Sequence, residues 1–341
     1  MKLFKDADNN SETSNGFLSV LWTIHVPEIH LQIVSFFNLI VLSGLISVLG
    51  TVANVINLIV FYRQGLNTNI NISFFALTLS DLSCLILQQW HIVIEFFKYT
   101  NLPIVFTDFQ HATAAWPHEL LTRLTCAITL YITVERCLCV MLPFAISKIF
   151  TVKRTLVVII CIYGVHFASW IPAYTSCYIG WKFFPERNQT LLGLIFVATE
   201  QTIAIFYIAN AFSGVFVITC IVLVTLILKW QLRIKSDWRN SANAEQKKAE
   251  MLSKRERKTV VMVILIAVIL VVCYTPSVTL SLITFCVPGF NVGGKYFEIY
   301  QFVWSFAYVL ENINSSGNIF LYFKMGSKYR STFKRLFRNE D

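Results

Sequence analysis

Charged side chains are scarce in this chain. Asp, Glu, Lys and Arg make up 14% of its 341 residues, whereas 56% of the residues are hydrophobic. A soluble protein carries about 25% charged residues. The mean hydropathy of +0.62 reflects more Phe, Ile, Val and Leu than a single globular core can bury. The scarcity of charge therefore excludes an ordinary soluble domain and predicts an integral membrane protein.

Motifs of catalysis and of structural metal sites are also absent. The sequence contains no HExxH or GxSxG motif, and the nine cysteines show no zinc or redox spacing. Most of the cysteines lie in or beside apolar stretches, where cysteine behaves as a small hydrophobic residue. We therefore expect no enzyme, no cofactor beyond a sodium ion considered below, and no disulfide framework.

Seven apolar stretches are long enough to cross a bilayer as helices, which takes about 20 residues each. Strands of a membrane β-barrel would be half as long and would alternate in polarity. The stretches cover residues 33–62, 70–97, 111–141, 153–175, 200–229, 257–287 and 296–323. They predict an all-α membrane protein with an N-terminal tail at 1–32, a seven-helix domain at 33–323 and a C-terminal segment at 324–341.

Basic residues are distributed unevenly between the segments that join these stretches. With the N-terminus outside the cell, most of the 28 lysines and arginines lie on the cytoplasmic side, chiefly in 229–258 and 324–338. The positive-inside rule therefore predicts an extracellular N-terminus. The net charge of +9 then points to anionic lipid headgroups, and we expect no nucleic-acid partner.

Polar residues recur at intervals of three or four on three of the stretches, which places them on one face of each helix. Three such faces cannot all meet lipid, so they predict a polar bundle interior. Asp81, Glu95 and Glu311 are functional candidates, because ionisable groups inside a membrane are costly. The three stripes are Asp81, Cys84, Gln88, His91 and Glu95; His118, Thr122, Thr125 and Thr129; and Trp304, Tyr308, Glu311, Ser315, Asn318 and Tyr322.

A receptor and a multi-span transporter without G-protein coupling are the two function classes that such a bundle could serve. Transporters commonly show repeated halves with helices interrupted at matching places. Pro143, Pro172 and Pro276 show no such symmetry. A pore would need repeated like charges on several helices, and these are missing too. The sequence therefore favours a receptor.

Six motifs occur in order along the chain: "GTVANVINLIVF", "LTLSDL", "ERC", "CYTP", "NSSGNIFLYF" and "KMGSKYRSTFKRLF". In this order they resemble the motifs of rhodopsin-like (class A) G-protein-coupled receptors, over all seven stretches. "ERCLCV" and "KMGSKYRSTF" are most similar to molluscan chemosensory and invertebrate neuropeptide receptors. The resemblance implies a short amphipathic eighth helix and a receptor in the plasma membrane. It also implies that an extracellular small molecule or peptide activates a heterotrimeric G protein.

The resemblance assigns a conformational switch to six residues. Arg136 would pair with an acidic residue, Glu135 or Glu256, and would be freed when the sixth helix swings outward. The sequence departs from the family pattern at three places: His111 replaces a disulfide cysteine, Tyr274 a tryptophan and Ile319 a proline. The predicted switch residues are Glu135, Arg136, Glu256, Pro276, Asn318 and Tyr322.

The ligand can be bounded by two positions that the family uses. Amine receptors carry an acid where this chain has His118, and opsins carry a lysine where it has Asn312, so the resemblance predicts neither a monoamine nor retinal. An aromatic pocket with several acids suits a small polar or cationic molecule or a short peptide. The predicted lining is Trp90, His91, Glu95, His118, Glu119, Thr122, Arg123, Tyr207, Tyr274, Trp304, Tyr308 and Glu311.

Arg123 lies within the third apolar stretch, where a lone cation is costly. Glu119 stands one turn before it, in the order that favours an ion pair on a helix. Glu311 is a second candidate partner. We expect the pair to orient a polar ligand at the pocket floor.

Two further expectations concern a cation and glycans. Family members hold a sodium ion with oxygen ligands, which hard cations prefer; the matching residues here are Asp81, Thr125, Asn314, Ser315 and Asn318. Of the four Asn-x-Ser/Thr sequences, those at Asn9 and Asn188 face outward in the predicted topology, so these two are the expected glycosylation sites.

Overall fold

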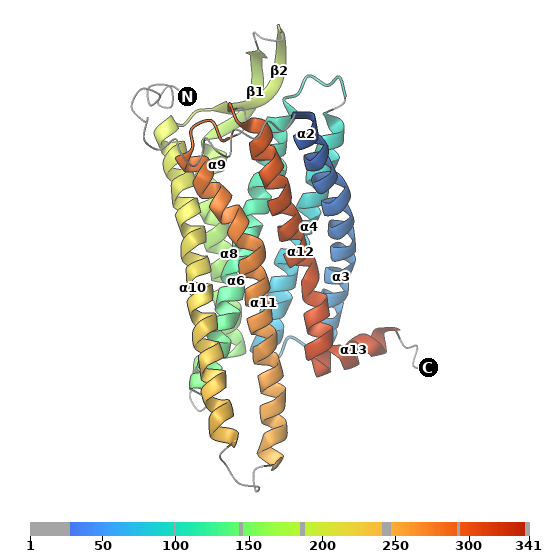
Figure 1. Ribbon diagram of the computed structural model, residues 1–341, viewed down its shortest axis with the longest axis vertical. Coiled ribbons are helices and arrows are strands. Elements are labelled where there is room, and N and C mark those ends of the chain that lie inside the picture. The colour runs from blue at the N-terminus through green and yellow to red at the C-terminus, as the bar shows by residue number, and fades with distance from the viewer. Residues whose placement is uncertain are drawn as a thin grey trace.

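The computed structural model describes residues 28–98, 100–142, 146–184, 188–240, 247–291 and 294–337, and only the backbone of residues 147, 184, 200, 203–204, 235–240 and 247–256. Long helices run side by side in a bundle (Figure 1). The first is formed by α2 (Glu28–Phe36), the π-helical η3 (Phe37–Leu42) and α3 (Ser43–Arg63). The others are α4 (Asn69–Phe97); α5 (Phe106–Gln110), the π-helical η4 (His111–Ala115) and α6 (Trp116–Met141); α7 (Ile146–Ile149) and α8 (Val152–Ser169) with α9 (Ile171–Thr175); α10 (Glu200–Asn240); α11 (Lys247–Cys286); α12 (Phe297–Met325); and α13 (Ser327–Phe337).

Six of the described helical segments are long and apolar enough to cross a membrane: Glu28–Arg63, Asn69–Phe97, Phe106–Met141, Val152–Thr175, Ile205–Ile234 and Arg257–Cys286. The seventh helix, α12, is 29 residues long but does not reach the same hydropathy. It packs against α3 and α11 in the bundle. The all-α membrane bundle that the sequence predicts is therefore confirmed, and the predicted spans agree with the helices apart from their ends.

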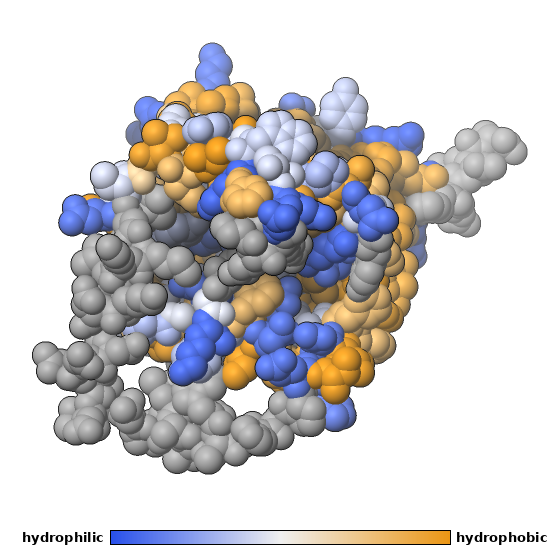
Figure 2. All heavy atoms as spheres, turned by 90° about the horizontal axis from the view of Figure 1, so that it is seen from above, coloured by the Kyte–Doolittle hydropathy of each residue, from blue (hydrophilic) through white to orange (hydrophobic). Residues whose placement is uncertain are grey.

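Hydrophobic side chains lie on the outside of the bundle and polar side chains lie inside, which is the opposite of their distribution in a soluble protein. Leu45 and Leu49 on α3 are 61% and 62% exposed, whereas Asn54 on the same helix is 1% exposed and Asp81 on α4 is 0% exposed. Seen from the hairpin end, hydrophobic residues are visible along the flank of the bundle and hydrophilic residues gather toward its middle (Figure 2). The outer face suits hydrocarbon, and the polar stripes point inward as expected.

Gly50 on α3 marks a close approach between the first and the seventh helix. A Cβ atom built at this position would collide with the side chain of Ser316 on α12. Beside it, the Asn54 amide donates hydrogen bonds to the backbone carbonyls of Gly50 (3.0 Å) and Ser315 (2.8 Å). Small residues let membrane helices approach closely, and the asparagine amide joins the two backbones there.

The short eighth helix, α13, turns away from the end of α12 opposite the hairpin (Figure 1). Tyr329 anchors it: its ring is 3% exposed and packs against Phe61, with ring centroids 5.5 Å apart, and against Tyr322 at 5.7 Å. Basic residues Lys328, Arg330, Lys334 and Arg335 occupy the same helix. The expected amphipathic eighth helix is thus present, with Tyr329 buried against the bundle and the Lys328 side chain donating to the Gln64 carbonyl at 3.0 Å.

A β-hairpin between the fourth and fifth helices was not expected from the sequence. Strands β1 (Cys177–Phe184) and β2 (Gln189–Phe196) pair antiparallel, with Cys177 opposite Phe196, and project beyond the bundle (Figure 1). Asn188 before β2 has a positive φ of 47°, which asparagine tolerates better than most residues. The aromatic and β-branched residues of 177–196 favour strands. Because the helices on either side are equally apolar, this signal did not stand out in the sequence.

Candidate ligand-binding cavity

A cavity of about 750 Å³ lies between the helices at the hairpin end of the bundle. Its lining comes from α5, η4, α6, α8, α10, α11 and α12, and Leu194 and Phe196 of β2 contribute from the hairpin. Cavities of 300–1,000 Å³ are typical of small-molecule sites. Nine residues predicted from the sequence line it: His118, Glu119, Thr122, Arg123, Tyr207, Tyr274, Trp304, Tyr308 and Glu311.

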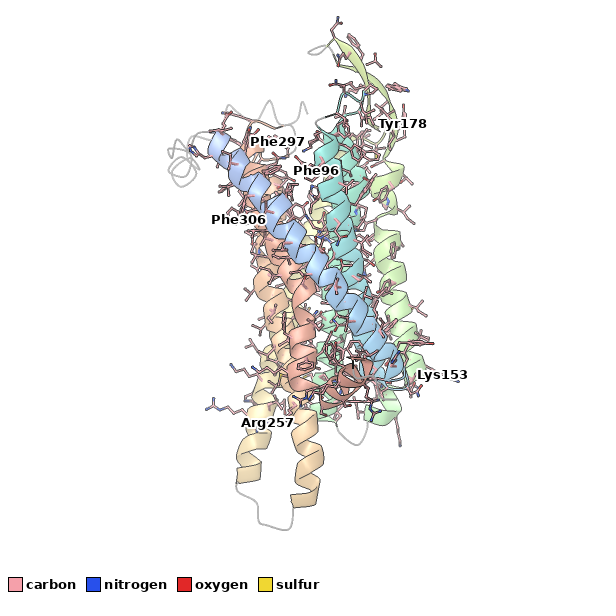
Figure 3. All side chains as sticks on the ribbon, turned by 90° about the vertical axis from the view of Figure 1, so that its right-hand side faces the viewer. Phe96, Lys153, Tyr178, Arg257, Phe297 and Phe306 are labelled. Atoms are coloured by element: carbon pink, nitrogen blue, oxygen red, sulfur yellow. The ribbon has the colours of Figure 1, made fainter. Side chains whose placement is uncertain are left out.

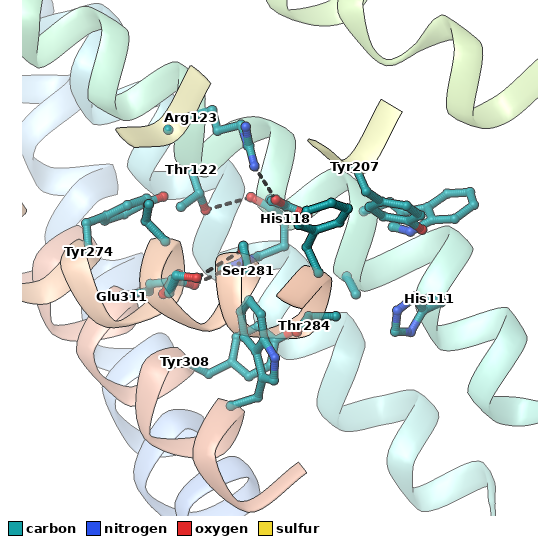
Figure 4. A pocket seen from close by; sticks show the side chains of 18 of the residues that line it. His111, His118, Thr122, Arg123, Tyr207, Tyr274, Ser281, Thr284, Tyr308 and Glu311 are labelled. Atoms are coloured by element: carbon teal, nitrogen blue, oxygen red, sulfur yellow. Dashed lines mark hydrogen bonds and ion pairs between the residues drawn. The ribbon is translucent and has the colours of Figure 1, made fainter. Parts of the chain in front are cut away.

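Glu311 and His118 form the polar floor of the cavity (Figure 4). The Glu311 side chain is buried; its Oε1 accepts a hydrogen bond from the Ser277 hydroxyl, and its Oε2 lies 3.5 Å from His118 Nδ1. The His118 ring packs edge-on against Tyr308, with centroids 5.6 Å apart. Residues of α6, α11 and α12 therefore meet at one carboxyl group.

Arg123 stands beside the floor and is turned toward α10. Its Nη2 donates to Glu119 Oε1 at 2.5 Å, and its Nη1 donates to the Ser213 hydroxyl at 2.9 Å and to the backbone carbonyl of Asn210. The ion pair expected between Glu119 and Arg123 is present. The bonds to Asn210 and Ser213, which fix α6 to α10, were not foreseen, because sequence spacing gives no register between two helices.

Three predicted lining residues do not lie in the cavity wall. Trp90 is 38% exposed, and its indole N–H donates to Thr113 at 3.0 Å. Glu95 pairs with Lys98 at 2.6 Å and accepts from the Gln110 amide at 3.0 Å. His91 lies behind Tyr308, ring centroids 5.2 Å apart. The cavity wall does not include these three residues, because the polar stripe of α4 faces α5, η4 and α12. A role for them in ligand binding stays a prediction.

Several lining residues were missed by the sequence reasoning. Asp108 precedes the predicted third stretch and accepts a hydrogen bond from the backbone N–H of Leu194 at 3.0 Å, so it ties the hairpin to the cavity rim. His111, His166, Ser277, Ser281, Thr284 and Tyr300 also contribute. The polar residues among them were visible in the sequence, but nothing in it showed which helix face meets the cavity.

Cys177 at the start of β1 is a free thiol, as are the other eight cysteines. Its sulfur lies 3.6 Å from the Ala173 carbonyl, and partial burial raises the pKa of the thiol. A thiol with a raised pKa forms little thiolate and exchanges disulfides slowly. His111, which the resemblance places at a disulfide cysteine position, lines the cavity.

Asp81 lies below the cavity, fully buried. Its Oδ2 accepts from the Asn318 amide at 2.8 Å, and Thr125 Oγ1 lies 3.4 Å from its Oδ1. Asn314 and Ser315 are buried on the same helix as Asn318. The structure thus brings Asp81, Thr125 and Asn318 together, and the sodium site that they would form stays a prediction.

The structure describes the side chains of five of the six predicted switch residues. Glu135 Oε1 and Arg136 Nη2 are 2.6 Å apart, and both residues line a second cavity of about 500 Å³ with the start of α4 and segment 146–152. Pro276 lies inside α11. Tyr322 packs edge-on against Phe61, ring centroids 5.0 Å apart. The side chain of Glu256 lies outside the described part of the structure, so the pairing of Arg136 with it stays a prediction.

The glycosylation sites also stay predictions. Asn9 falls outside the described residues, and Asn188 is exposed at the hairpin turn. Asn71 and Asn314, the two sites that the predicted topology excludes, are buried.

Comparison with known proteins matches the chain to one family model. The model of the serpentine type 7TM GPCR chemoreceptor Srw family matches residues 41–340. No curated protein matches the chain. The match runs from the end of η3 to beyond α13. A family of receptors agrees with the function class that the sequence favoured over a transporter. The chain belongs to the Srw family of serpentine seven-transmembrane G-protein-coupled chemoreceptors.

Proposed function

We propose that this chemoreceptor binds an extracellular chemical or short peptide in the 750 Å³ cavity and then activates a heterotrimeric G protein. One observation carries the proposal. Tyr274 and Ser277, which flank Pro276 on α11, both line the cavity. Proline removes a backbone hydrogen bond and lets a helix bend. A ligand that contacts these residues therefore acts at the point where α11 bends most readily.

The hydrogen bond from Ser277 to Glu311 couples α11 to α12 at the same level. A ligand that changes this bond would bind the receptor with a different affinity when α11 is packed inward than when it has swung outward. Only such a difference shifts a conformational equilibrium. Away from the cavity, Val260 of α11 packs with Cys137 of α6 and Leu228 of α10. An outward movement of α11 there would free Arg136 for a G protein.

The orientation that suits this function places the hairpin outside the cell. Tyr178, Phe96 and Phe297 lie toward the hairpin end, and Lys153 and Arg257 toward the other end (Figure 3). The basic end would face the cytoplasm by the positive-inside rule. In this orientation, the Asn9→Gln variant keeps one glycan, at Asn188, and glycosidase treatment should make the receptor migrate faster on a gel. Adding Asn188→Gln should abolish this shift in migration. Persistence of the shift would contradict the orientation.

The test of the function is a screen of the expressed receptor. Small water-borne chemicals and neuropeptides are applied, and nucleotide exchange on co-expressed G proteins is measured. Ser281→Trp fills the cavity from α11 and should abolish any response. Thr279→Trp on the same helix is the matched control, because Thr279 faces outward and is exposed. Ion flux without nucleotide exchange would favour a transporter, and an equal response from both tryptophan variants would place the ligand elsewhere.

A further inference from the structure

The cavity wall carries an unequal set of charges. Among the described residues, its lining holds the carboxyl groups of Asp108, Glu119 and Glu311, the guanidinium of Arg123 and no lysine. Two of the carboxyl groups, Glu119 on α6 and Glu311 on α12, line the same cavity from different helices. Acidic groups therefore outnumber cations among the described residues of this wall, and charge interactions beside a protein interior are stronger than in bulk water.

Arg123 is not offered to a ligand. Its side chain is 13% exposed, and its two terminal nitrogens are occupied by Glu119, Ser213 and the Asn210 carbonyl. An anionic ligand could reach this guanidinium only by displacing Glu119. Arg123 therefore acts as a positioning residue that holds the Glu119 carboxylate in place.

Glu119 keeps one oxygen for an incoming group. Oε1 receives the Arg123 hydrogen bond, whereas Oε2 has no hydrogen-bond partner among the described residues. Its side chain is 33% exposed and lines the cavity. A carboxylate held by a cation on one side and open on the other is a ready acceptor for a charged donor.

Glu311 lacks a permanent cation. Its described partners are the Ser277 hydroxyl and the imidazole of His118, and the residue is 5% exposed. A buried carboxylate without a paired cation is costly. A cation in the cavity would remove that cost, so an occupant of this charge gains more from Glu311 than a neutral one does.

Aromatic rings surround the two carboxyl groups. Tyr207, Tyr274, Trp304 and Tyr308 line the same space, and the Trp304 and Tyr308 rings lie 5.9 Å apart. Aromatic faces attract organic cations and also bury an apolar body. Rings and carboxyl groups together define an amphipathic site.

We propose that the ligand of this cavity is an organic cation, with an ammonium or guanidinium group bound between Glu119 and Glu311 and an apolar body against the aromatic wall. The proposal rests on the proposed function only in taking this cavity as the ligand site. Position 118, on which the sequence excluded a monoamine, holds a histidine that contacts Glu311. The acids that would bind the cation stand instead at 119 and 311.

The test uses full-length receptor in nanodiscs without G protein. The probes are 2-phenylethylamine, tryptamine and benzylguanidine, each compared with the neutral and the carboxylate analogue of the same skeleton. Thermal stabilisation as a function of concentration gives the affinities. Cationic probes should bind at least about ten-fold more tightly than their analogues, the ratio expected when one charge-assisted hydrogen bond is gained. Glu311→Gln and Glu119→Gln should each remove the preference.

Glu95→Gln is the matched control, because Glu95 is a carboxylate outside the cavity wall, and it should leave the preference intact. If Glu119→Gln fails to fold without a partner for Arg123, Glu311→Gln carries the test alone. Equal binding of the three charge types, preference for the carboxylates, or no binding of any cation would overturn the proposal. Because binding is measured without a G protein, cation binding without nucleotide exchange would count against the proposed function and leave this inference standing.

Discussion

The hydroxyl of Tyr329 on α13 donates a hydrogen bond of 2.5 Å to Asn57 Oδ1 on α3. Both side chains are buried. The Asn57 amide lies 3.5 Å from Asn54 Oδ1, and Asn54 donates to the Ser315 carbonyl on α12 at 2.8 Å. Polar contacts thus run from the eighth helix through the first to the seventh, beside the Asp81 cluster. Burial raises the pKa of the Tyr329 phenol, so it remains a donor at physiological pH.

Tyr329→Phe should destabilise the receptor, because Asn57 Oδ1 would be left buried without its donor. Such a loss costs about 1–3 kcal/mol, and the ring packing is retained. A lower melting temperature of the purified receptor is the expected result. Tyr62→Phe on α3 is the matched control, since Tyr62 is 71% exposed. Equal melting of both variants would show that the hydroxyl contributes nothing.

Arg123→Ala should reduce surface expression and ligand response together. Glu119 loses its cation and the Asn210 carbonyl loses its donor, and hydrogen bonds to charged groups contribute about 1.5–3 kcal/mol each. The double variant Glu119→Arg, Arg123→Glu restores the ion pair but places a carboxylate beside the Asn210 carbonyl. Expression measured by surface labelling should therefore recover in part, and the response should not.

Lys98→Ala provides the comparison for Arg123→Ala, because it breaks the Glu95–Lys98 pair outside the cavity wall. It should leave the ligand response unchanged. Full recovery of expression and response in the double variant would make the Glu119–Arg123 pair purely structural.

Sodium should raise the melting temperature of the receptor relative to an equal concentration of N-methylglucamine, and it should lower agonist affinity. The oxygens of Asp81 and Thr125 and the neighbouring Asn318 suit a hard cation. Asp81→Asn removes the charge with little change of shape and should abolish both effects. A wild-type receptor indifferent to sodium would exclude the site.

Arg136→Ala should abolish nucleotide exchange on the G protein, and Glu256→Ala should raise exchange in the absence of ligand. The second effect is expected because loss of the acidic partner frees Arg136. The inactive conformation then loses one stabilising contact, and the free-energy difference of a few kcal/mol between the inactive and the active conformation becomes smaller. Exchange is measured on membranes matched for surface expression. Basal exchange unchanged in Glu256→Ala would leave Glu135, 2.6 Å from Arg136, as the partner that matters.

The sequence by itself determined the class of the protein and the place of its helices. A membrane span requires about 20 apolar residues, and polar residues at helical spacing must face inward, so both features are written locally in the chain. The Glu119–Arg123 pair is similarly local, one helical turn apart. These predictions agree with the structure because each depends on residues within a few turns of one another.

Only the tertiary structure decided which residues share the cavity. Trp90, His91 and Glu95 belong to the expected stripe of α4, yet the rotation of that helix directs them to Thr113, Tyr308 and Gln110. Ser277 meets Glu311, and Arg123 meets Asn210, across helices separated by 34 and 87 residues in sequence. The rotation and register of neighbouring helices are set by packing over their whole length, and no short stretch of sequence carries that information.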